Sequence, residues 1–277
     1  MSYVIAIANQ KGGVGKTTTV VNFAAMLSAK KKTVLVIDLD PQANATSGLG
    51  VEPKDGVSLY PALMGTKAID EVILGTVVEN VNVIPSEVNL AGAEIEIARM
   101  EDHLHGLNKI LEPIKQANIF DYIIIDCPPS LGILMSNALA AADSVIIPMQ
   151  CEYYAMEGLS VITQLIERLR STGVNPKLSL DGILMTMYNK TRLADEVISQ
   201  VREHYADTVF ETVIPRSVRA GEAPSYGLPV VVYSPASTVA IGYSEFTKEF
   251  LKREKSKEII SNASDAPLPN SISSTLA

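Results

Sequence analysis

The sequence predicts an α/β protein with a doubly wound, mainly parallel sheet that carries helices on both faces. Short runs rich in Val and Ile alternate with longer segments of helical periodicity along most of the 277 residues. Most of the runs are apolar throughout, which is typical of strands buried on both faces. The helical segments between them have the length of crossovers that join parallel strands.

Eight runs are candidate strands, of which the last two are weaker. In chain order they cover 3–8, 33–38, 81–85, 121–126, 144–149, 180–187, 208–214 and 229–233. A helical pattern from Val239 to about Ile260 follows. The remainder is rich in Ser, Asn and Pro and has no periodic apolar face. We therefore expect one domain over 1–260 and a disordered tail over 261–277.

The composition limits the class of protein. At 47% hydrophobic and 19% charged residues, the chain can bury one large core. It has neither an apolar run of membrane-spanning length nor a leader at Met1, so we expect a cytoplasmic protein without a membrane partner. Cys127 and Cys151 are too few for a disulfide framework. The net charge of −8 argues against a globally basic nucleic-acid binder, although a local basic patch remains compatible with it.

A glycine-rich stretch, "NQKGGVGKTT" (9–18), follows the first strand and leads into a helix. Its glycines let the backbone turn tightly and aim N–H groups inward, and the helix start adds its positive dipole end. Such a cradle binds phosphate. Lys16 is placed to reach the β- and γ-phosphates of a nucleotide, and the Thr17 hydroxyl to bind Mg²⁺. The usual P-loop pattern GxxxxGK[ST] is broken at Gln10, and an additional lysine, Lys11, precedes the glycines.

Acidic residues end two of the predicted strands. The stretch "VLVIDLDPQ" places Asp38 at a strand end and Asp40 just beyond it, and "DYIIID" ends in Asp126. A carboxylate at the end of a buried strand is costly unless a cation or hydrogen bonds compensate it. We therefore expect Asp126 to hold Mg²⁺ beside Thr17, directly or through water. The alternative is that Asp126 only caps the next helix.

The stretch "KGGVGKTT" resembles the deviant Walker A motif of the ParA/MinD class of P-loop ATPases. Longer stretches are similar to the chromosomal ParA/Soj partitioning ATPases, so that the resemblance covers about residues 2 to 253. These stretches are "DLDPQANATSGLG", "DCPPSLGILMSNALAAAD", "QCEYYAMEGLSVI" and "TVIPRSVRAGEAPSYGLPVVVYSP". The resemblance implies a weak ATPase with ATP and Mg²⁺ as cofactors, a homodimer in the ATP state, and a role in segregating or positioning chromosome or plasmid origins.

The resemblance also assigns roles at the nucleotide. It implies that Lys16 serves the ATP of its own subunit and Lys11 that of the partner, and that Asp40 in switch I orients or activates the attacking water. Asp38 has a supporting role, and Asn44 and Thr46 are candidates for hydrogen bonds in switch I. The implied ATP-binding residues are Lys11, Gly12, Gly13, Val14, Gly15, Lys16, Thr17, Thr18, Asn189 and Pro215, the last two at the adenine.

Further surface residues are implied to contact partners. Glu152 would lie at the dimer interface near Lys11. Arg192 and Arg219 match positions where the short ParA proteins contact DNA without sequence preference, and Lys190 and Lys248 are weaker candidates. The segment from Arg168 to Arg219 holds eight Lys and Arg against six Asp and Glu, so basic residues are relatively enriched there. Each of these residues could instead be an ordinary solvated side chain.

The family implies a ParB/Spo0J-type centromere-binding partner and association with the nucleoid. Because the P-loop begins within ten residues of Met1, we expect the short form of ParA, which lacks an N-terminal DNA-binding extension. Three alternatives remain open. A MinD-like membrane ATPase would end in a basic amphipathic helix. A nitrogenase-reductase-like protein would need cysteines at a metal cluster. A metabolic P-loop enzyme, transferring phosphate or forming an amide, would share the fold and the loop.

Overall fold

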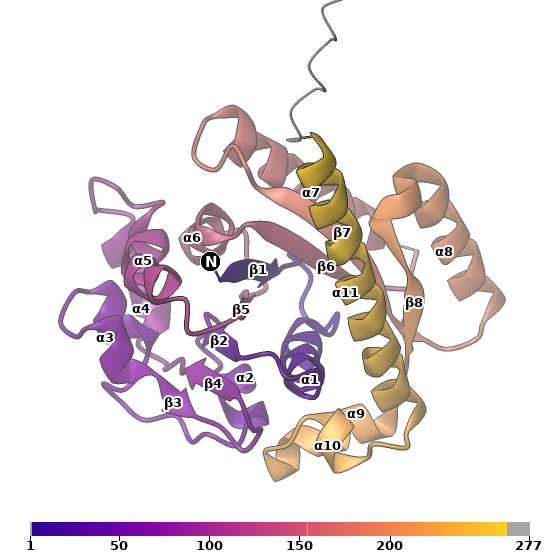
Figure 1. Ribbon diagram of the computed structural model, residues 1–277, viewed down its shortest axis with the longest axis horizontal. Helices are drawn as coiled ribbons and strands as arrows, with labels where there is room; N and C mark the ends of the chain where they lie inside the picture. Colours follow the sequence, from indigo (N-terminus) through magenta and orange to yellow (C-terminus); the bar gives the residue numbers. More distant parts are fainter. Residues whose placement is uncertain (1, 154, 265–277) are drawn as a thin grey trace, which may run out of the picture.

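A computed structural model describes residues 2–153 and 155–264 of the chain. Figure 1 shows a central eight-stranded sheet with helices on both faces. The strands lie in the order β3-β4-β2-β5-β1-β6-β7-β8, and β3–β4 is the antiparallel pair in an otherwise parallel sheet. Their bounds are Tyr3–Ile7 (β1), Val34–Asp38 (β2), Leu74–Gly75 (β3), Val81–Ile84 (β4), Tyr122–Asp126 (β5), Ser144–Gln150 (β6), Ser179–Tyr188 (β7) and Val209–Pro215 (β8). The doubly wound sheet predicted from the sequence is confirmed.

Successive residues of the central strands feed two separate cores. On β1, Val4 and Ala6 belong to one cluster of buried side chains, and Ile5 and Ile7 belong to the other. This alternation follows from the two-residue period of a strand and explains why these strands are apolar throughout.

The helices divide between the two faces. One core is covered by α3 (Leu59–Leu63), α4 (Leu90–Ile97), α5 (Gly106–Ala117), α6 (Ile133–Ala141), α7 (Ala155–Ser171) and α8 (Arg192–Tyr205). The other is covered by α1 (Lys16–Ser28), α2 (Asn44–Gly48), α10 (Val230–Tyr233) and α11 (Thr238–Ser264). The helix α9 (Val218–Glu222) and three 3₁₀ turns, η1 (Ile69–Val72), η2 (Ala206–Thr208) and η3 (Ala223–Tyr226), complete the described fold. None of the helices in the described part of the chain is both long and apolar enough to cross a membrane.

The described elements differ from the sequence predictions at three places. The run 229–233 is not a strand but contains helix α10, which starts after Pro229 and buries Val230 and Val231 against α1 and α11. The antiparallel strand β3 was not predicted, because two residues give no periodic signal. The last helix continues to Ser264, so the expected tail does not begin at 261. The rest of that tail, 265–277, lies outside the described residues.

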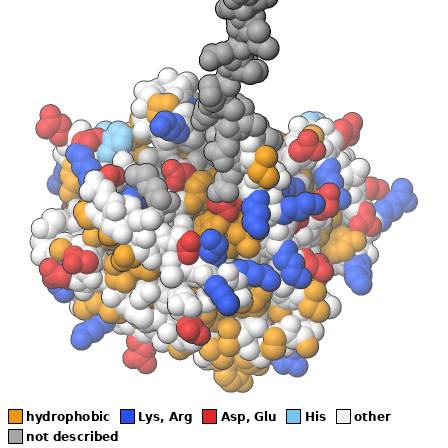
Figure 2. Space-filling model, in the orientation of Figure 1, with side chains coloured by type: hydrophobic (Ala, Val, Ile, Leu, Met, Phe, Trp, Pro, Cys, Tyr) orange, Lys and Arg blue, Asp and Glu red, His pale blue; other side chains and the backbone are white. Residues whose placement is uncertain are grey.

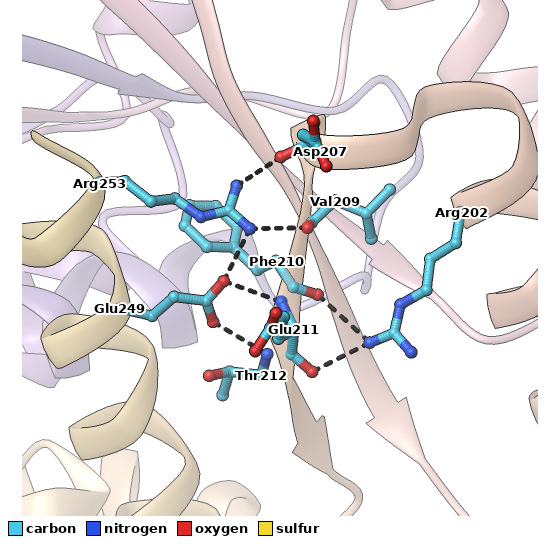
Figure 3. Close-up of polar contacts among 8 residues, drawn as sticks. All are labelled: Arg202, Asp207, Val209, Phe210, Glu211, Thr212, Glu249 and Arg253. Carbon is cyan, nitrogen blue, oxygen red and sulfur yellow. Dashed lines mark hydrogen bonds and ion pairs between the residues drawn. The ribbon is translucent and has the colours of Figure 1, made fainter. Parts of the chain in front are cut away.

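Strand β8 is irregular where it borders β7. Register positions 183 and 185 of β7 pair with 209 and 213 of β8, so residues 210–212 leave the ladder. Side chains from the flanking helices bind the freed backbone groups (Figure 3). Glu249 on α11 accepts the N–H groups of Glu211 and Thr212 at 2.8 and 2.9 Å, and Arg202 on α8 donates to two of the carbonyl oxygens. These bonds replace the ladder at this bulge in the last strand of the sheet.

Candidate nucleotide-binding site

The loop between β1 and α1 forms the predicted cradle. Gly13 and Gly15 have φ angles of +74° and +90°, in the left-handed region that favours glycine. Gly15 is the N-cap of α1 and has no side chain with which to cap this helix end. The N–H groups of the first turn are therefore available to an anion, at the positive end of the helix dipole.

Three side chains that the sequence analysis missed hold this loop in place. Asn9 donates to the carbonyl oxygen of Pro148 at 2.8 Å. Gln150, at the end of β6, donates to the Gly13 carbonyl at 3.0 Å, and Thr186 on β7 donates to the Val14 carbonyl at 2.8 Å. Gln150 and Thr186 lie far from the loop along the chain, so no local motif could have identified them.

The two lysines of the loop are placed differently. The Lys16 side chain folds back over its own loop, where Nζ donates to the carbonyl oxygen of Lys11 at 3.0 Å, and the residue is only 6% exposed. Burial lowers the pKa of Lys16, and the negative charge of Asp126 acts in the opposite direction. The Lys11 side chain is 39% exposed, and its Nζ lies 2.7 Å from Glu152 Oε2. The predicted proximity of Lys11 and Glu152 thus exists within one subunit.

Asp126 is a buried carboxylate without a hydrogen bond from the described residues. It ends β5 in register with Asp38 of β2 and has no exposed surface. None of the described residues gives either carboxylate oxygen a hydrogen bond. Burial raises the pKa of Asp126 well above its usual range, and the negative charge of Asp38 adds to the rise. The nearby Thr17 hydroxyl and the Lys16 ammonium group oppose it. Two unpartnered carboxylate oxygens beside a hydroxyl fit a Mg²⁺ ion, as the sequence predicted for Asp126 and Thr17.

Asp38 and Asp40 have local partners. Asp38 accepts the Asp40 and Thr46 N–H groups and the Thr46 hydroxyl. Burial raises the pKa of Asp38 to about 6, and the bonds from Thr46 oppose that rise. The Asp40 side chain is nearly buried, and its Oδ1 accepts the N–H of Gln42 at 3.0 Å. Asn44, predicted to bond in switch I, is the first residue of α2 and lines a neighbouring groove.

A pocket of about 210 Å³ opens beside the cradle. Pro215 and Asn189 were both predicted to lie at the adenine base of ATP. Pro215 lines this pocket, whereas Asn189 lies exposed on the loop after β7 and is not among the lining residues. Met187, which also lines the pocket, has a left-handed backbone (φ 54°) that is rare for a side chain of this size. The lining residues are Gly15, Thr18, Thr186, Met187, Ile214, Pro215, Arg216, Ser217, Ala220, Gly221, Val239 and Tyr243.

The two candidate DNA-binding arginines lie near the same edge of the sheet. Arg192 is the first residue of α8, which follows β7, and Arg219 is on α9, which follows β8. The ends of β7 and β8 pair at Tyr188 and Pro215. Arg192 and Arg219 form exposed ion pairs with acidic residues one turn on in their own helices, at 2.9 and 2.7 Å. Lys190 and Lys248 are also exposed.

The two cysteines do not form a metal site in the described structure. Cys127 and Cys151 are both buried free thiols. Among residues 2–153 and 155–264, no group of three or more His, Cys, Asp or Glu side chains is arranged to hold a metal ion.

A glycine-rich helix start, a lysine folded over it and a buried aspartate at the end of a neighbouring strand together place the molecule in the class of P-loop nucleotide-binding proteins. Residues 2–180 match a family model described as an AAA domain. The chain is 49% identical to the sporulation initiation inhibitor protein Soj of Bacillus subtilis over 251 residues, covering 90% of this chain and 98% of that protein. It is 44% identical to the chromosome partitioning protein ParA of Myxococcus xanthus, covering 92% and 89%. The chain belongs to the ParA/Soj family of chromosome-partitioning ATPases, which have a deviant Walker A motif.

Solved structures share the fold. Cobyrinic acid a,c-diamide synthase from Mycobacterium smegmatis, with bound ADP and magnesium, is 36% identical with a TM-score of 0.80, covering 93% of this chain and 97% of that one. The cell division ATPase MinD of Pyrococcus furiosus is 25% identical with a TM-score of 0.75, covering 91% and 100%. The same architecture therefore serves proteins with different names and tasks, and the site must decide between them.

Proposed function

We propose that this protein is an ATP- and Mg²⁺-dependent switch that dimerises on ATP, binds double-stranded DNA without sequence preference, and segregates or positions chromosome or plasmid origins with a ParB/Spo0J-type partner. It would act in the cytoplasm, on the nucleoid. The observation that carries the proposal is the unequal placement of the two lysines. Lys16 is committed to its own loop, whereas Lys11 presents its ammonium group at the surface beside Glu152.

The site residues divide the work of hydrolysis. The loop N–H groups and Lys16 bind the phosphates, and Asp126 and Thr17 hold Mg²⁺, which when bound neutralises charge on the β- and γ-phosphates. Asp40 orients the attacking water and accepts its proton. Positioning and charge stabilisation supply most of the catalysis in phosphoryl transfer, so a weak basal rate is expected until a partner completes the site.

Dimerisation would change the partner of Lys11. In the single subunit its ion pair with Glu152 is exposed at both ends, and such pairs contribute at most about 1 kcal/mol. A nucleotide from a second subunit offers several negative charges in a poorly solvated interface, where an ammonium group is strongly favoured. Exchange of Glu152 for the partner's phosphates is therefore energetically accessible, and it makes the dimer depend on ATP.

DNA binding would also depend on the dimer. On the face shown in Figure 2, basic and acidic side chains are interspersed, in keeping with the net charge of −8. The ion pairs of Arg192 and Arg219 are exposed, so DNA phosphates can compete for both arginines. One copy of each arginine gives weak attraction, whereas a dimer presents two copies together and gains avidity.

A second function, amide formation on a small molecule, has one observation in its favour. The diamide synthase from M. smegmatis shares 36% of residues and the fold over nearly the whole chain. The chromosome partitioning protein ParA of M. xanthus is closer in sequence, at 44%, and Soj of B. subtilis is closer still, at 49%. Stimulation of ATP hydrolysis separates the two functions. DNA together with a centromere-binding protein should stimulate a partitioning ATPase, whereas a carboxylic acid substrate and an amine donor should stimulate a synthase.

The direct test is sizing of the wild type and the Asp40→Ala variant with ATP, with ADP and without nucleotide. We expect a dimer with ATP but not with ADP or without nucleotide. The wild-type dimer should decay as ATP is hydrolysed, whereas the Asp40→Ala dimer should persist. The variant should hydrolyse about 10² to 10⁴ times more slowly, the usual contribution of a positioned base. A monomer under every condition, or wild-type turnover by Asp40→Ala, would contradict the proposal.

A further inference from the structure

The buried carboxylate of Asp38 binds both ends of the segment that carries Asp40. Asp38 ends β2 and has no exposed surface. Its Oδ1 accepts the backbone N–H of Asp40 at 3.2 Å, and its Oδ2 accepts both the N–H and the hydroxyl of Thr46, at 2.8 and 2.7 Å. The two oxygens of one side chain therefore hold both ends of the stretch from 40 to 46.

Thr46 links this closure to a third element. Its Oγ1 also accepts the N–H of Ser86 at 3.1 Å, just beyond the end of β4. The residue is completely buried, so water does not compete for these bonds. Because the hydroxyl hydrogen is directed at Asp38, the oxygen lone pairs remain free to accept the bond from Ser86. One hydroxyl thus ties β2, α2 and the segment after β4 together.

We propose that Thr46 is a positioning residue for ATP hydrolysis. It fixes the orientation of the Asp38 carboxylate, which in turn holds the backbone of Asp40, so the Asp40 side chain is presented to the attacking water in one place. The inference rests on the proposed function, since it concerns the same reaction.

Hydrolysis is sensitive to such a restraint. Asp40 has one carboxylate bond of its own in the described structure, to the N–H of Gln42 two residues along the same stretch. Because Gln42 belongs to the same stretch, this bond cannot anchor the stretch to the sheet. Asp38 ends β2 and Ser86 lies just beyond β4, so the bonds to these two residues can anchor it. A displacement of about 1 Å in a catalytic group can reduce the rate by 10²-fold. Binding of the phosphates depends instead on the loop around Gly15 and Lys16, which Thr46 does not contact through any hydrogen bond described.

The test compares two substitutions of the same residue. Thr46→Val has nearly the same volume but lacks the hydroxyl, and Thr46→Ser keeps the hydroxyl but lacks the methyl group. We expect Thr46→Val to lower kcat roughly 10- to 100-fold with little change in the Kd for ATP. Thr46→Ser should retain most of the wild-type kcat. Amide hydrogen exchange of residues 40–46 should be faster in Thr46→Val than in Thr46→Ser.

The outcomes are distinguishable. A purely structural role predicts lower thermal stability in both variants and a kcat per folded molecule equal to wild type, which would overturn the proposal. Equal loss of kcat in Thr46→Ser and Thr46→Val would also overturn it. If Thr46→Val does not fold, Asp38→Asn removes one acceptor at nearly constant shape and should show the same separation of kcat from Kd. Absence of ATP turnover in the wild type would instead refute the proposed function itself.

Discussion

At the scale of single residues, the buried carboxylate of Asp126 lowers the free energy of unfolding when no cation is bound. The Asp126 carboxylate is buried with neither oxygen bonded by a described residue, and its register neighbour is another acid, Asp38. Natural proteins keep such a group where function needs it, because a buried carboxylate without hydrogen bonds destabilises the fold. With Asp126 as the proposed magnesium ligand, bound Mg²⁺ would offset this cost, and folding and cofactor binding would be linked at this carboxylate.

Asp126→Asn tests that linkage. The raised pKa means that the folded state holds a proton that the unfolded chain has already released, so this residue makes the free energy of unfolding fall as the pH rises above the ordinary Asp range. Asn stays neutral. We expect the nucleotide-free variant to be more stable than wild type by about 1–3 kcal/mol near pH 8, with the difference shrinking toward pH 4. Urea unfolding at several pH values measures it.

The same variant should lose the stabilisation that ATP and Mg²⁺ give the wild type, measured as the shift in melting temperature. Lower stability of Asp126→Asn than wild type at every pH would show that Asp126 is compensated and that the cation site lies elsewhere.

At the scale of elements, packing between neighbouring strands limits what the fold tolerates. A Cβ atom on Gly182 of β7 would lie 2.9 Å from the Thr208 carbonyl oxygen and closer still to the Phe210 ring. Phe210 is fully buried and packs edge-on against Phe246 of α11, with ring centroids 4.9 Å apart. The irregular border of β7 and β8 therefore requires glycine at this position.

We predict that Gly182→Ala destabilises the protein by about 1–3 kcal/mol, because the core must shift to admit a methyl group. Gly75→Ala is the matched control, since a Cβ there meets nothing within 4 Å and neither glycine has a positive φ. The control should change stability by less than about 0.5 kcal/mol. Equal effects of the two substitutions in urea unfolding would mean that the contact with Phe210 is not limiting.

Much of the fold followed from local pattern. The buried strands of the parallel sheet and the cradle after β1 have strong signals, because burial on both faces and the glycine spacing leave few alternatives. The valine run at 230–232 was wrongly predicted as a strand because valine has a high β propensity. It is helical because it is buried against α1, where Asn22 accepts the Val231 N–H at 3.0 Å. Thr186 could not be predicted, because its bond to the P-loop spans 172 residues.

At the scale of the whole molecule, the proposed DNA surface has to be built from few basic residues in an acidic chain. Arg219→Glu should abolish most DNA binding by the ATP dimer while ATP affinity and dimerisation stay unchanged. The salt slope of log K should fall by about 0.9 for every DNA phosphate that the variant no longer neutralises. Filter binding of a random duplex at several salt concentrations measures both the affinity and the slope.

Arg170→Glu is the matched control for that experiment. Arg170 also pairs with an acid three residues away, Glu167, but lies on α7, so the charge change is the same at a different place. We expect it to bind DNA nearly as wild type. Equal losses in Arg170→Glu and Arg219→Glu would mean that net charge alone, and not a patch at Arg219, governs binding.

Light scattering with ATP and Mg²⁺ tests most directly whether Lys11 serves the dimer and Lys16 serves the ATP of its own subunit. On an Asp40→Ala background, which preserves ATP, the parent protein should double its mass. Adding Lys16→Ala should remove both ATP binding and the dimer, and adding Lys30→Ala, an exposed lysine after α1, should change neither. Adding Lys11→Ala should leave ATP bound to a monomer. An ATP-dependent dimer of normal affinity in that Lys11→Ala protein would contradict the account.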